Sequence, residues 1–573
     1  MHQPELLDAA VVRAWVGTAA RALAEARVEI DRVNVFPVAD GDTGTNMYLT
    51  IRDAAAAVRS APEDAGGARL LRLAARAALL GARGNSGVIL SEWLRGLTVA
   101  ATRGDSLAIA LDVAARTARR AVAHPAPGTI LTAAESAAAA ARQAEAGGMV
   151  GPAGAAARLS TTDAACRGAR EAALRSVGAL EPLRTAGVLD AGACGLVLVL
   201  RSLAAAQRAV SDRGREGVSE ADGSIGPVLL DIDLHGHAPD AASDVDDAPV
   251  DPGVPPDGAL DAGRHEHGGV ATDDVELMFV LERSASADDF SPGAVADALR
   301  ADLDDVGSSV VVVGGGADGS AGPAGDDADR ALWQAHVHTA DLDAALGVAR
   351  RWASRGAVSR VSVRHLAVPP DRWAVVVTTA APALAAELAR GGAVVVLDLD
   401  VPPTADDLAA AAVGAGAPRV LVLAPEALQE EPAVPASADG ADEAPEIVRV
   451  TAPGDVHLVA GMSALAATLD DPGEQDAGVP AAVGAVVAGL RVGGGPAVTV
   501  GAIVKRLVAG SPTAIVTLLP DDDVPDATVE VLASRAAAVS GGADVVVMRT
   551  GRRGDHVAIG VEPLVTDPAE EPA

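Results

Sequence analysis

The stretch "NVFPVADGDTGTNM", residues 34–47, interrupts a chain that is dominated by alanine, valine and leucine. Within it, Asn34, Asp40 and Asp42 offer three hard oxygen ligands close together. Mg²⁺ prefers such ligands, with substrate phosphates and waters completing its shell. The stretch therefore predicts a magnesium site, and the alternative interpretation is an ordinary Asp/Gly turn that precedes a helix.

The residues that follow these aspartates are suited to phosphate. The backbone amides of Gly44, Thr45 and Asn46 are expected at the start of the next helix, where free N–H groups and the helix dipole favour anions. Such a site needs no lysine, and the chain contains a single lysine, Lys505, which lies in no glycine-rich phosphate loop. A protein-kinase core also requires a strand lysine, so the composition excludes both of these nucleotide-binding classes.

Helical patterns surround this stretch throughout residues 1–205. In the first of them, apolar residues recur at the spacing of a helix face, at Val12, Trp15, Val16, Ala19 and Leu23. Further helices are predicted at 46–59, 68–80, 86–102, 105–122, 130–145, 153–177 and 191–208. Short turns that contain glycine or proline separate several of these segments, so the sequence predicts an all-α bundle of about eight helices.

A second small-residue turn lies in "GARGNSGVILSEWLRG", residues 81–96. Glycines surround Asn85 and Ser86 just before an apolar helical run. The amides of such a turn, together with the Ser86 hydroxyl, could hold a transferring phosphoryl group. The alternative is close helix–helix packing through small residues.

Two more polar turns precede predicted helices. Gly128 and Thr129 open the helix that follows "PAPG", and Asp190 lies in a small-residue turn before the last helix. Asp190 could accept hydrogen bonds from a ribose or from a neighbouring loop, whereas the alternative for both turns is a plain helix start. Turns of this kind can meet at one rim of a helical bundle, so the four turns together predict a single site.

Composition limits the broad class of the protein. The 573 residues suggest about three or four domains, and the formal charge of −33 disfavours nucleic acid and anionic lipid as partners. Two cysteines, Cys166 and Cys194, cannot form a disulfide framework, which is typical of a reducing cytoplasm. The N-terminal residues do not read as a signal peptide, and charges or glycine clusters interrupt the long apolar runs, so no transmembrane segment is expected.

The composition changes after residue 208. Residues 209–272 are rich in Asp, Pro and Gly, which predicts a flexible acidic linker. Residues 273–368 show strand and helix patterns in the order βαββαβ, which is typical of a ferredoxin-like α+β domain. Residues 369–573 repeat strand and helix, which predicts an α/β domain with a parallel sheet. An acidic insertion at 429–446 and a flexible tail at 565–573 are expected within this last part.

The four motifs together resemble the DhaL/DAK2 kinase family. "NVFPVADGDTGTNM" with "GARGNSGVILS", "GTILT" and "AGVLDAG" is similar to its ATP-binding domain, and within the family to the FakA-type (YloV-like) catalytic subunit of fatty acid kinase. The resemblance covers most of residues 1–205 and the rest in outline. It implies a DhaL-like eight-helix barrel over residues 1–208, with ATP and two Mg²⁺ ions at one rim, and a DegV-like C-terminal domain.

The resemblance also assigns roles to individual residues. It implies that Asp40 and Asp42 hold Mg²⁺ with Asn34 as a third ligand, and that both aspartates act with Ser86 in catalysis. The residues that it places around the nucleotide are Thr43, Gly44, Thr45, Asn46, Asn85, Ser86, Gly128, Thr129, Asp190 and Gly192. Phosphoryl transfer depends mainly on positioning and charge neutralisation, so no dedicated nucleophile is required.

A second metal site is predicted in the middle domain. His336 and His338 alternate on one predicted strand, so both side chains face the same side and could bind one metal ion. The family usually supplies a cysteine on the first strand of this domain, and Glu276 lies near that place. A His₂Glu zinc set is therefore chemically reasonable, and the alternative is two exposed strand histidines.

These observations support three hypotheses. The first is an ATP-dependent kinase subunit that converts a fatty acid, held by a FakB (DegV-type) partner, to acyl phosphate. The second is a glycerone-type kinase subunit, and the third is a non-catalytic ATP-binding scaffold. The segment "LDLDVPPTADD" stands where relatives carry Gly-Gly-Gln-Thr-Met-Asn, which leaves partner choice open. A homodimer is also consistent with the resemblance.

Overall fold

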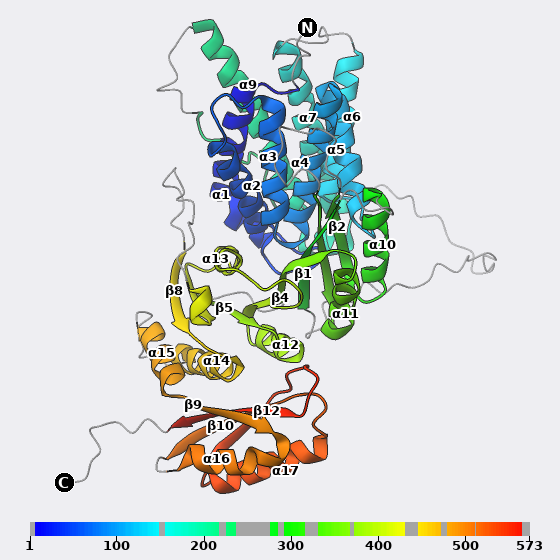
Figure 1. Cartoon of the computed structure of the whole chain (residues 1–573). Coiled ribbons are helices and arrows are strands. Elements are labelled where there is room, and N and C mark those ends of the chain that lie inside the picture. The colour runs from blue at the N-terminus through cyan, green and yellow to red at the C-terminus, as the bar shows by residue number, and fades with distance from the viewer. Residues whose placement is uncertain are drawn as a thin grey trace, which may run out of the picture.

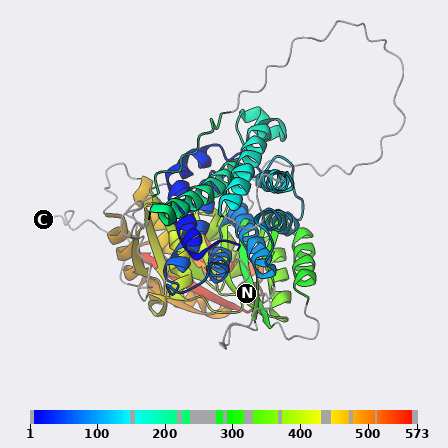
Figure 2. The same cartoon turned by 90° about the horizontal axis from the view of Figure 1, so that it is seen from above.

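The computed structural model describes residues 6–147, 155–216, 225–235, 275–284, 291–315, 330–366, 372–429, 445–470, 478–509 and 512–563. Within these ranges a helical unit packs against one face of an eight-stranded sheet, and a four-stranded sheet lies beyond it (Figure 1). Viewed from above, the helices lie over the strands (Figure 2). The fold therefore consists of an N-terminal helical unit followed by a region of mixed sheets.

The N-terminal unit is helical, as predicted. Its helices are α1 (Ala9–Arg32), α2 (Thr43–Arg59), α3 (Gly67–Gly81), α4 (Gly84–Arg103), α5 (Leu107–Ala121), α6 (Ile130–Ala146), α7 (Ala155–Arg175), α8 (Glu181–Ala186) and α9 (Ala191–Glu216). Each of the long helices α1 to α7 contacts the next one, α7 contacts α9, and α9 contacts α1, so the neighbours form a closed ring.

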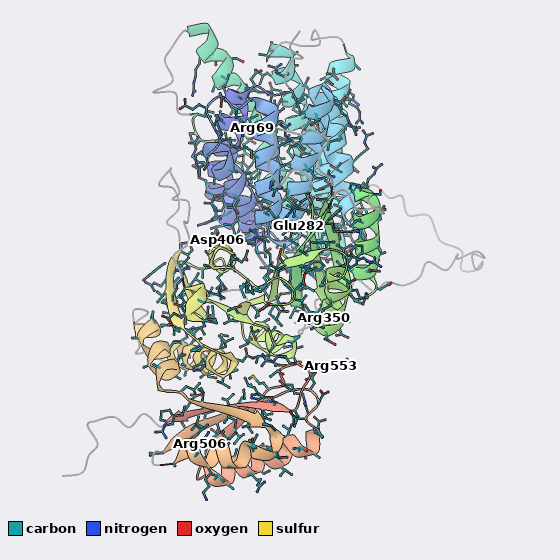
Figure 3. The ribbon with its side chains drawn as sticks, viewed as in Figure 1. Arg69, Glu282, Arg350, Asp406, Arg506 and Arg553 are labelled. Atoms are coloured by element: carbon teal, nitrogen blue, oxygen red, sulfur yellow. The ribbon has the colours of Figure 1, made fainter. Side chains whose placement is uncertain are left out.

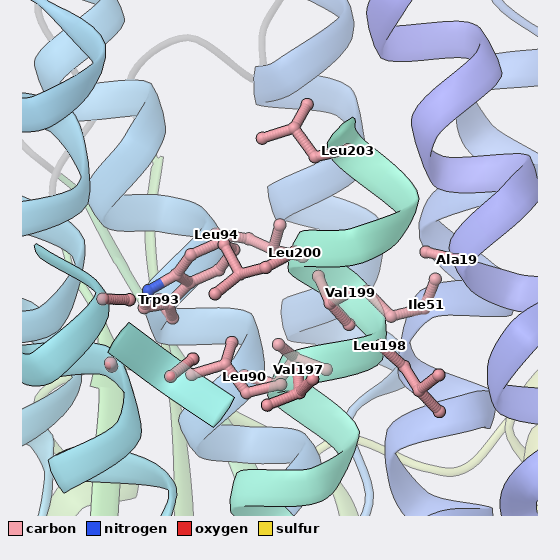
Figure 4. Close-up of a cluster of buried hydrophobic side chains, with 14 of the residues drawn as sticks. Ala19, Ile51, Leu90, Trp93, Leu94, Val197, Leu198, Val199, Leu200 and Leu203 are labelled. Carbon is pink, nitrogen blue, oxygen red and sulfur yellow. The ribbon is translucent and has the colours of Figure 1, made fainter. Parts of the chain in front are cut away.

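The core of this unit is built around the first half of α9. Its residues 196–200 are all buried, and they pack between Trp93 of α4 and the helices α1 and α2 (Figure 4). Trp15 of α1 lies edge-on to Trp93, with ring centroids 6.4 Å apart, and its indole N–H donates to the Val199 carbonyl at 2.9 Å. Two tryptophans thus fill a core that otherwise consists mostly of Ala, Val and Leu.

Helix α9 also passes the length and hydropathy test for a membrane span. Residues Ala191–Arg213 have a mean hydropathy of 1.4, and 72% of the tested window is buried inside the protein. A core helix of a globular domain has the same properties, because it is apolar on all sides.

Close packing between α1 and α2 fixes the position of the 34–47 stretch. A Cβ atom at Gly44 would overlap the backbone of Arg27, so only glycine allows the first turn of α2 to approach α1 this closely. The loop between the two helices is consequently held against the end of α1.

The next elements form the predicted βαββαβ unit. They are β1 (Val275–Ser284), α10 (Pro292–Asp304), β2 (Ser308–Gly314), β3 (Arg330–Thr339), α11 (Leu342–Ala353) and β4 (Ala357–His365). The strands pair antiparallel in the order β2-β3-β1-β4, which is the ferredoxin-like arrangement. Along β1, Leu277, Phe279 and Leu281 belong to the core shared with α10 and α11, whereas Glu276 and Met278 alternate to the other face.

The same sheet continues into four parallel strands. They belong to the segment β5 (Trp373–Thr379), α12 (Pro382–Arg390), β6 (Ala393–Leu397), α13 (Ala405–Val413), β7 (Arg419–Ala424) and β8 (Glu446–Thr451). Strand β4 pairs antiparallel with β6, so one eight-stranded sheet spans the predicted boundary at 368/369. The predicted domain boundary therefore falls inside a single sheet. Strand β4 is the last strand of the βαββαβ unit, and it pairs with β6 of the following segment.

The last described strands form a second, smaller sheet. It follows α14 (Asp455–Asp470) and α15 (Val479–Gly489), and contains β9 (Arg491–Pro496), α16 (Val500–Val508), β10 (Thr513–Pro520), α17 (Asp526–Val539), β11 (Asp544–Val547) and β12 (His556–Pro563). Its order is β11-β10-β12-β9, with only the β10–β11 pair parallel.

The predicted linker, 209–272, is partly ordered. Its beginning belongs to α9, and residues 225–235 lie on the helical unit, where Ile232 and Leu234 are buried and the Leu234 carbonyl accepts from the Leu189 amide at 3.1 Å. Those apolar side chains explain why this part is not a free spacer. The rest of the predicted linker, most of the 429–446 insertion and the 565–573 tail lie outside the described residues.

Candidate functional site

Four predicted turns share one rim of the helical unit. The long helices alternate in direction around the ring, so α2, α4, α6 and α9 all begin at the end that faces the eight-stranded sheet (Figure 1). In the view with side chains, Glu282 of β1 and Asp406 of α13 lie along the boundary between this rim and the sheet (Figure 3). The topology therefore brings together turns that are distant in sequence.

The first two turns touch each other directly. The hydroxyls of Thr43 and Ser86 are 3.0 Å apart and share a hydrogen bond. Gly84 has a positive φ of 52°, and a Cβ atom there would overlap the side-chain amide of Asn46. Asn85, next to Gly84, has a buried Oδ1 without a hydrogen-bond partner among the described residues. The 34–47 and 81–96 motifs thus form one surface.

The other two turns also meet, but their polar groups serve the helix starts. Gly192 approaches Ile130 at the start of α6, and the Asp190 carboxylate accepts from the Ala193 amide at 2.7 Å. Burial raises the pKa of Asp190 to about 7. Thr129 is the N-cap of α6, and the Gly128 amide donates to the hydroxyl of Thr132 at 2.9 Å.

One prediction about the first turn is wrong. The amides of Gly44 and Thr45 are not free for phosphate, because both donate to the carboxylate of Asp31, at 2.6 and 3.1 Å. The Asn46 amide bonds the Asp42 carbonyl at 2.8 Å. Asp31, in the last turn of α1, was missed from the sequence because its role depends on the close approach of α1 and α2. The first turn of α4 differs in this respect, because the first amides of a helix have no partner within the helix itself.

The predicted magnesium ligands do lie together. Asn34 donates from Nδ2 to Oδ1 of Asp40 at 2.6 Å. Asp42 occupies the N-cap position of α2, yet its side chain makes no capping hydrogen bond. Burial, and next the negative charge of Asp42, raise the pKa of Asp40 well above the usual value for an aspartate. A divalent cation would relieve this repulsion, so the residues fit a Mg²⁺ site.

The sheet contributes a cation that the sequence analysis missed. Arg364, near the end of β4, donates from Nη2 to Oδ2 of Asp42 at 2.6 Å. The same guanidinium forms a two-point contact with Glu276, through Nε at 2.8 Å and Nη2 at 3.0 Å. Burial alone would raise the pKa of Glu276, but the charge and hydrogen bonds of Arg364, together with the two neighbouring histidines, outweigh burial and hold this pKa at about 2. Glu276 therefore stays ionised and fixes Arg364 against the rim.

A sequence signal for this contact exists, but it requires the strand register. Glu276 lies opposite Arg364 on one neighbouring strand and opposite His338 on the other. An oppositely charged cross-strand pair is a recognisable stabilising feature once the strands are aligned. Nothing in the sequence indicates that this face of the sheet meets the helical rim.

The two strand histidines are buried, so the interpretation of exposed histidines is wrong. His336 is 0% exposed and His338 is 4% exposed. Ligand atoms of Glu276, His336 and His338 all lie within 4.8 Å of one another. Burial lowers the pKa of both imidazoles, to about 3 for His338, and both ring nitrogens of His336 lack a hydrogen-bond partner among the described residues. Neutral, unpartnered imidazoles are the form that binds metal, so the set fits a metal ion chemically.

The two predicted metal sites are therefore parts of one cluster. Arg364 bridges Asp42 on the helical side to Glu276 on the sheet side, and Glu276 Oε2 lies 3.6 Å from Nδ1 of His336. With Asp40, Asp42 and Glu276 ionised, three negative charges face one guanidinium.

A cavity of about 80 Å³ separates the rim from the sheet beside this cluster. Its polar lining includes Asn46, Arg83, Glu276, Gln334, Arg360 and Arg364. Arg83 donates to the Ala410 carbonyl at 2.8 Å, and Arg360 donates to the Leu80 carbonyl at 3.2 Å. These two arginines tie the rim to the sheet, whereas Arg364 points at the predicted metal ligands.

Metal binding at the rim should depend on pH. The raised pKa of Asp40 means that this carboxyl keeps its proton to higher pH than a free aspartate, and a bound cation must displace that proton. Affinity should therefore rise with pH through the neutral range, by up to about tenfold per pH unit for one displaced proton, and then level off. Electron paramagnetic resonance with Mn²⁺ as the probe measures this, and Asp40→Asn should flatten the profile. An affinity for Mn²⁺ in the wild-type chain that does not change with pH would contradict the assignment.

Residues 37–205 match the family model of the DAK2 domain, so most of the helical unit is similar to that domain. This match supports a kinase-related function.

Particular relatives extend the match beyond the helical unit. Protein YloV of Bacillus subtilis is 26% identical over 371 residues, which are 63% of this chain and 56% of YloV. An uncharacterized protein of Staphylococcus haemolyticus is 44% identical over 117 residues, which are 20% of this chain and 21% of that protein. The matched part of the chain thus spans between about a fifth and just over half of the length of these relatives. A crystal structure of the dihydroxyacetone kinase from C. freundii in complex with AMP-PNP and Mg²⁺ aligns with a TM-score of 0.27 at 20% identity, over 36% of this chain and 35% of that one.

Proposed function

We propose that the chain is an ATP-dependent phosphotransferase that phosphorylates a fatty acid held by a separate DegV-type carrier protein, giving an acyl phosphate. The observation that carries the proposal is the meeting of Asp40 and Asp42 with the Ser86 turn at one rim of a DAK2 domain. The relation to YloV covers 371 residues, which is more than the helical unit contains, and this supports a role for the sheet region as well.

In this proposal, the rim holds ATP as its magnesium complex. Asp40 and Asp42 would hold Mg²⁺, which neutralises phosphate charge, and Asn34 orients the Asp40 carboxylate. The first turn of α4 offers amide groups to the phosphates, and the Ser86 hydroxyl, already placed by Thr43, offers a further donor. No lysine is needed in such an arrangement.

The remaining contribution of the protein is positioning. A phosphoryl group passes between donor and acceptor without a protein nucleophile when both oxygens lie in line and the charge is compensated. The sheet covers the rim through contacts such as Gln334 Nε2 to the Ala82 carbonyl at 3.1 Å, which limits the access of water to the phosphates. Exclusion of water favours transfer to a bound acceptor over hydrolysis.

The proposal includes a cytoplasmic location, where ATP and a reduced Cys194 are both expected. A zinc ion at Glu276, His336 and His338 is also part of it, and these residues would hold that ion close to the rim. A glycerone-type kinase is the second candidate, and it leaves the long sheet region unexplained.

The test combines the purified chain with ATP, Mg²⁺ and a DegV-type protein loaded with fatty acid. Trapping with hydroxylamine should yield the acyl hydroxamate, and the matching Asp42→Ala reaction should yield none. A parallel reaction with dihydroxyacetone in place of the loaded carrier separates the second candidate. ATP binding without product from either acceptor would overturn the proposed function.

A further inference from the structure

Arg364 reaches the rim from a different unit than every other residue of the predicted phosphate site. It lies near the end of β4, and its Nη2 contacts Oδ2 of Asp42 at 2.6 Å. It also lies beside the second loop, since a Cβ atom at Gly84 would be 3.7 Å from the same nitrogen. The guanidinium therefore lies between the two turns that the proposed function assigns to the phosphates.

The orientation of Arg364 is fixed in advance. Glu276 is 4% exposed, and its carboxylate accepts two hydrogen bonds from the guanidinium, one from Nε and one from Nη2. Such paired contacts give both strength and direction. The side chain of Arg364 is 30% exposed and that of Glu276 is 5% exposed, so the carboxylate that holds the guanidinium is the more deeply buried partner.

The contact with Asp42 leaves room for a second state. In the proposed function the Asp42 carboxylate binds Mg²⁺, which would compete with Nη2 of Arg364 for Oδ2 of Asp42 while Glu276 still holds the guanidinium. The nearest new acceptors for that nitrogen are phosphate oxygens bound at the same rim. An arginine that points at a phosphoryl group is a recurring device for stabilising the charge of phosphoryl transfer.

We infer that Arg364 is a catalytic residue that contacts the phosphoryl group during transfer, and that Glu276 positions it; this inference rests on the proposed function. In the step, an acceptor oxygen forms a bond to the γ-phosphorus, the bond to the bridging oxygen of ADP breaks, and ADP leaves with the electron pair. Arg364 keeps its protons throughout and contributes charge and hydrogen bonds. The sheet thus completes the active site of the helical unit.

The test compares Arg364→Gln with Arg360→Gln as a matched control. Arg360 lies on the same strand and also ties the sheet to the helical unit, through the Leu80 carbonyl, and it pairs with Asp407 of α13 instead of Asp42. We expect Arg364→Gln to lower kcat by about 10³-fold, with Mg·ADP affinity changed by no more than about threefold, and Arg360→Gln to change kcat by no more than about threefold. A kcat within about tenfold of wild type in Arg364→Gln would overturn the inference.

Two further variants guard against misfolding, because Arg364→Gln leaves the Glu276 carboxylate buried without its partner. The double variant Glu276→Gln/Arg364→Gln removes both charges and should fold, as circular dichroism reports, while remaining as slow as the single variant. Arg364→Lys keeps the charge but not the two-point contact, so it should recover only part of the lost rate. If Arg364→Lys recovered the full wild-type rate, the charge alone would matter, and this would contradict a role for the oriented two-point contact with Glu276.

Binding of ADP with aluminium fluoride, a mimic of the phosphoryl group in transfer, separates this inference from the proposed function. This measurement needs no acceptor protein. Wild type should bind the mimic more tightly than Mg·ADP, and Arg364→Gln should lose that difference. If the mimic and Mg·ADP weaken equally in Arg364→Gln, the residue is only a structural tie. If wild type binds neither ligand, both the proposed function and this inference fail.

Discussion

Asp42→Ala should abolish magnesium-dependent nucleotide binding while the helical unit stays folded. Asp42 lies at the N-cap of α2, but its side chain makes no capping bond, so the helix loses little when it is removed. The predicted metal site loses one of two carboxylates. Mutation of outer-sphere partners alone typically weakens metal binding by 10- to 100-fold, so loss of a direct ligand should cost at least about 100-fold. Displacement of a fluorescent ADP analogue, with and without Mg²⁺, measures this loss.

The matched control for this prediction is Asp64→Ala. Asp64 is an exposed aspartate in the turn between α2 and α3, at the opposite end of α2 from Asp42. The Asp64→Ala variant should bind the nucleotide as wild type does. Near-ultraviolet circular dichroism should be the same for wild type, Asp42→Ala and Asp64→Ala. Nucleotide affinity in Asp42→Ala within about threefold of wild type would remove Asp42 from the site.

Trp15→Ala should destabilise the helical unit more than any substitution of an exposed residue. Trp15 is 1% exposed, packs edge-on against Trp93, and donates to the Val199 carbonyl of α9. Replacing a buried tryptophan by alanine typically costs about 3–5 kcal/mol, and here it also removes the hydrogen bond to the buried Val199 carbonyl. Hydrogen exchange followed by mass spectrometry should show peptides of α1 and α9 exchanging at least about 100-fold faster.

Val28→Ala is the matched control on the same helix. Val28 is 51% exposed, so its truncation should change stability by no more than about 0.5 kcal/mol and leave exchange in α9 unchanged. Exchange in Trp15→Ala that matches Val28→Ala would mean that the two tryptophans do not anchor α9.

Much of the fold follows from patterns that are local in sequence. The 3.6-residue spacing around Val12 and Trp15 predicts α1, and the run of strand and helix patterns after residue 273 predicts the βαββαβ order that the structure has. Glycine-rich turns before α2 and α4 were predicted to meet, and the Thr43–Ser86 contact places those two turns side by side. Local patterns suffice here because helix direction alternates and thereby determines which turns share a rim.

The parts that the sequence did not predict all depend on contacts between distant elements. The Asp31 carboxylate accepts hydrogen bonds from the amides of Gly44 and Thr45 only because α1 and α2 pack closely at Gly44. Arg364 reaches Asp42 across 322 positions of sequence, and its strand looks like an ordinary amphipathic strand. The single sheet formed by β1 to β8 depends on the β4–β6 pairing, for which the sequence carries no local signal.

The measurement that tests the central claim most directly is calorimetric titration of the wild-type chain with ADP, in Mg²⁺ and again in EDTA. The claim is that the rim binds nucleotide phosphates through a metal held by Asp40 and Asp42, without a lysine. We expect one binding event per chain in Mg²⁺ and a loss of at least about 100-fold in affinity in EDTA. Equal affinity in the two conditions, or no binding in either, would contradict it.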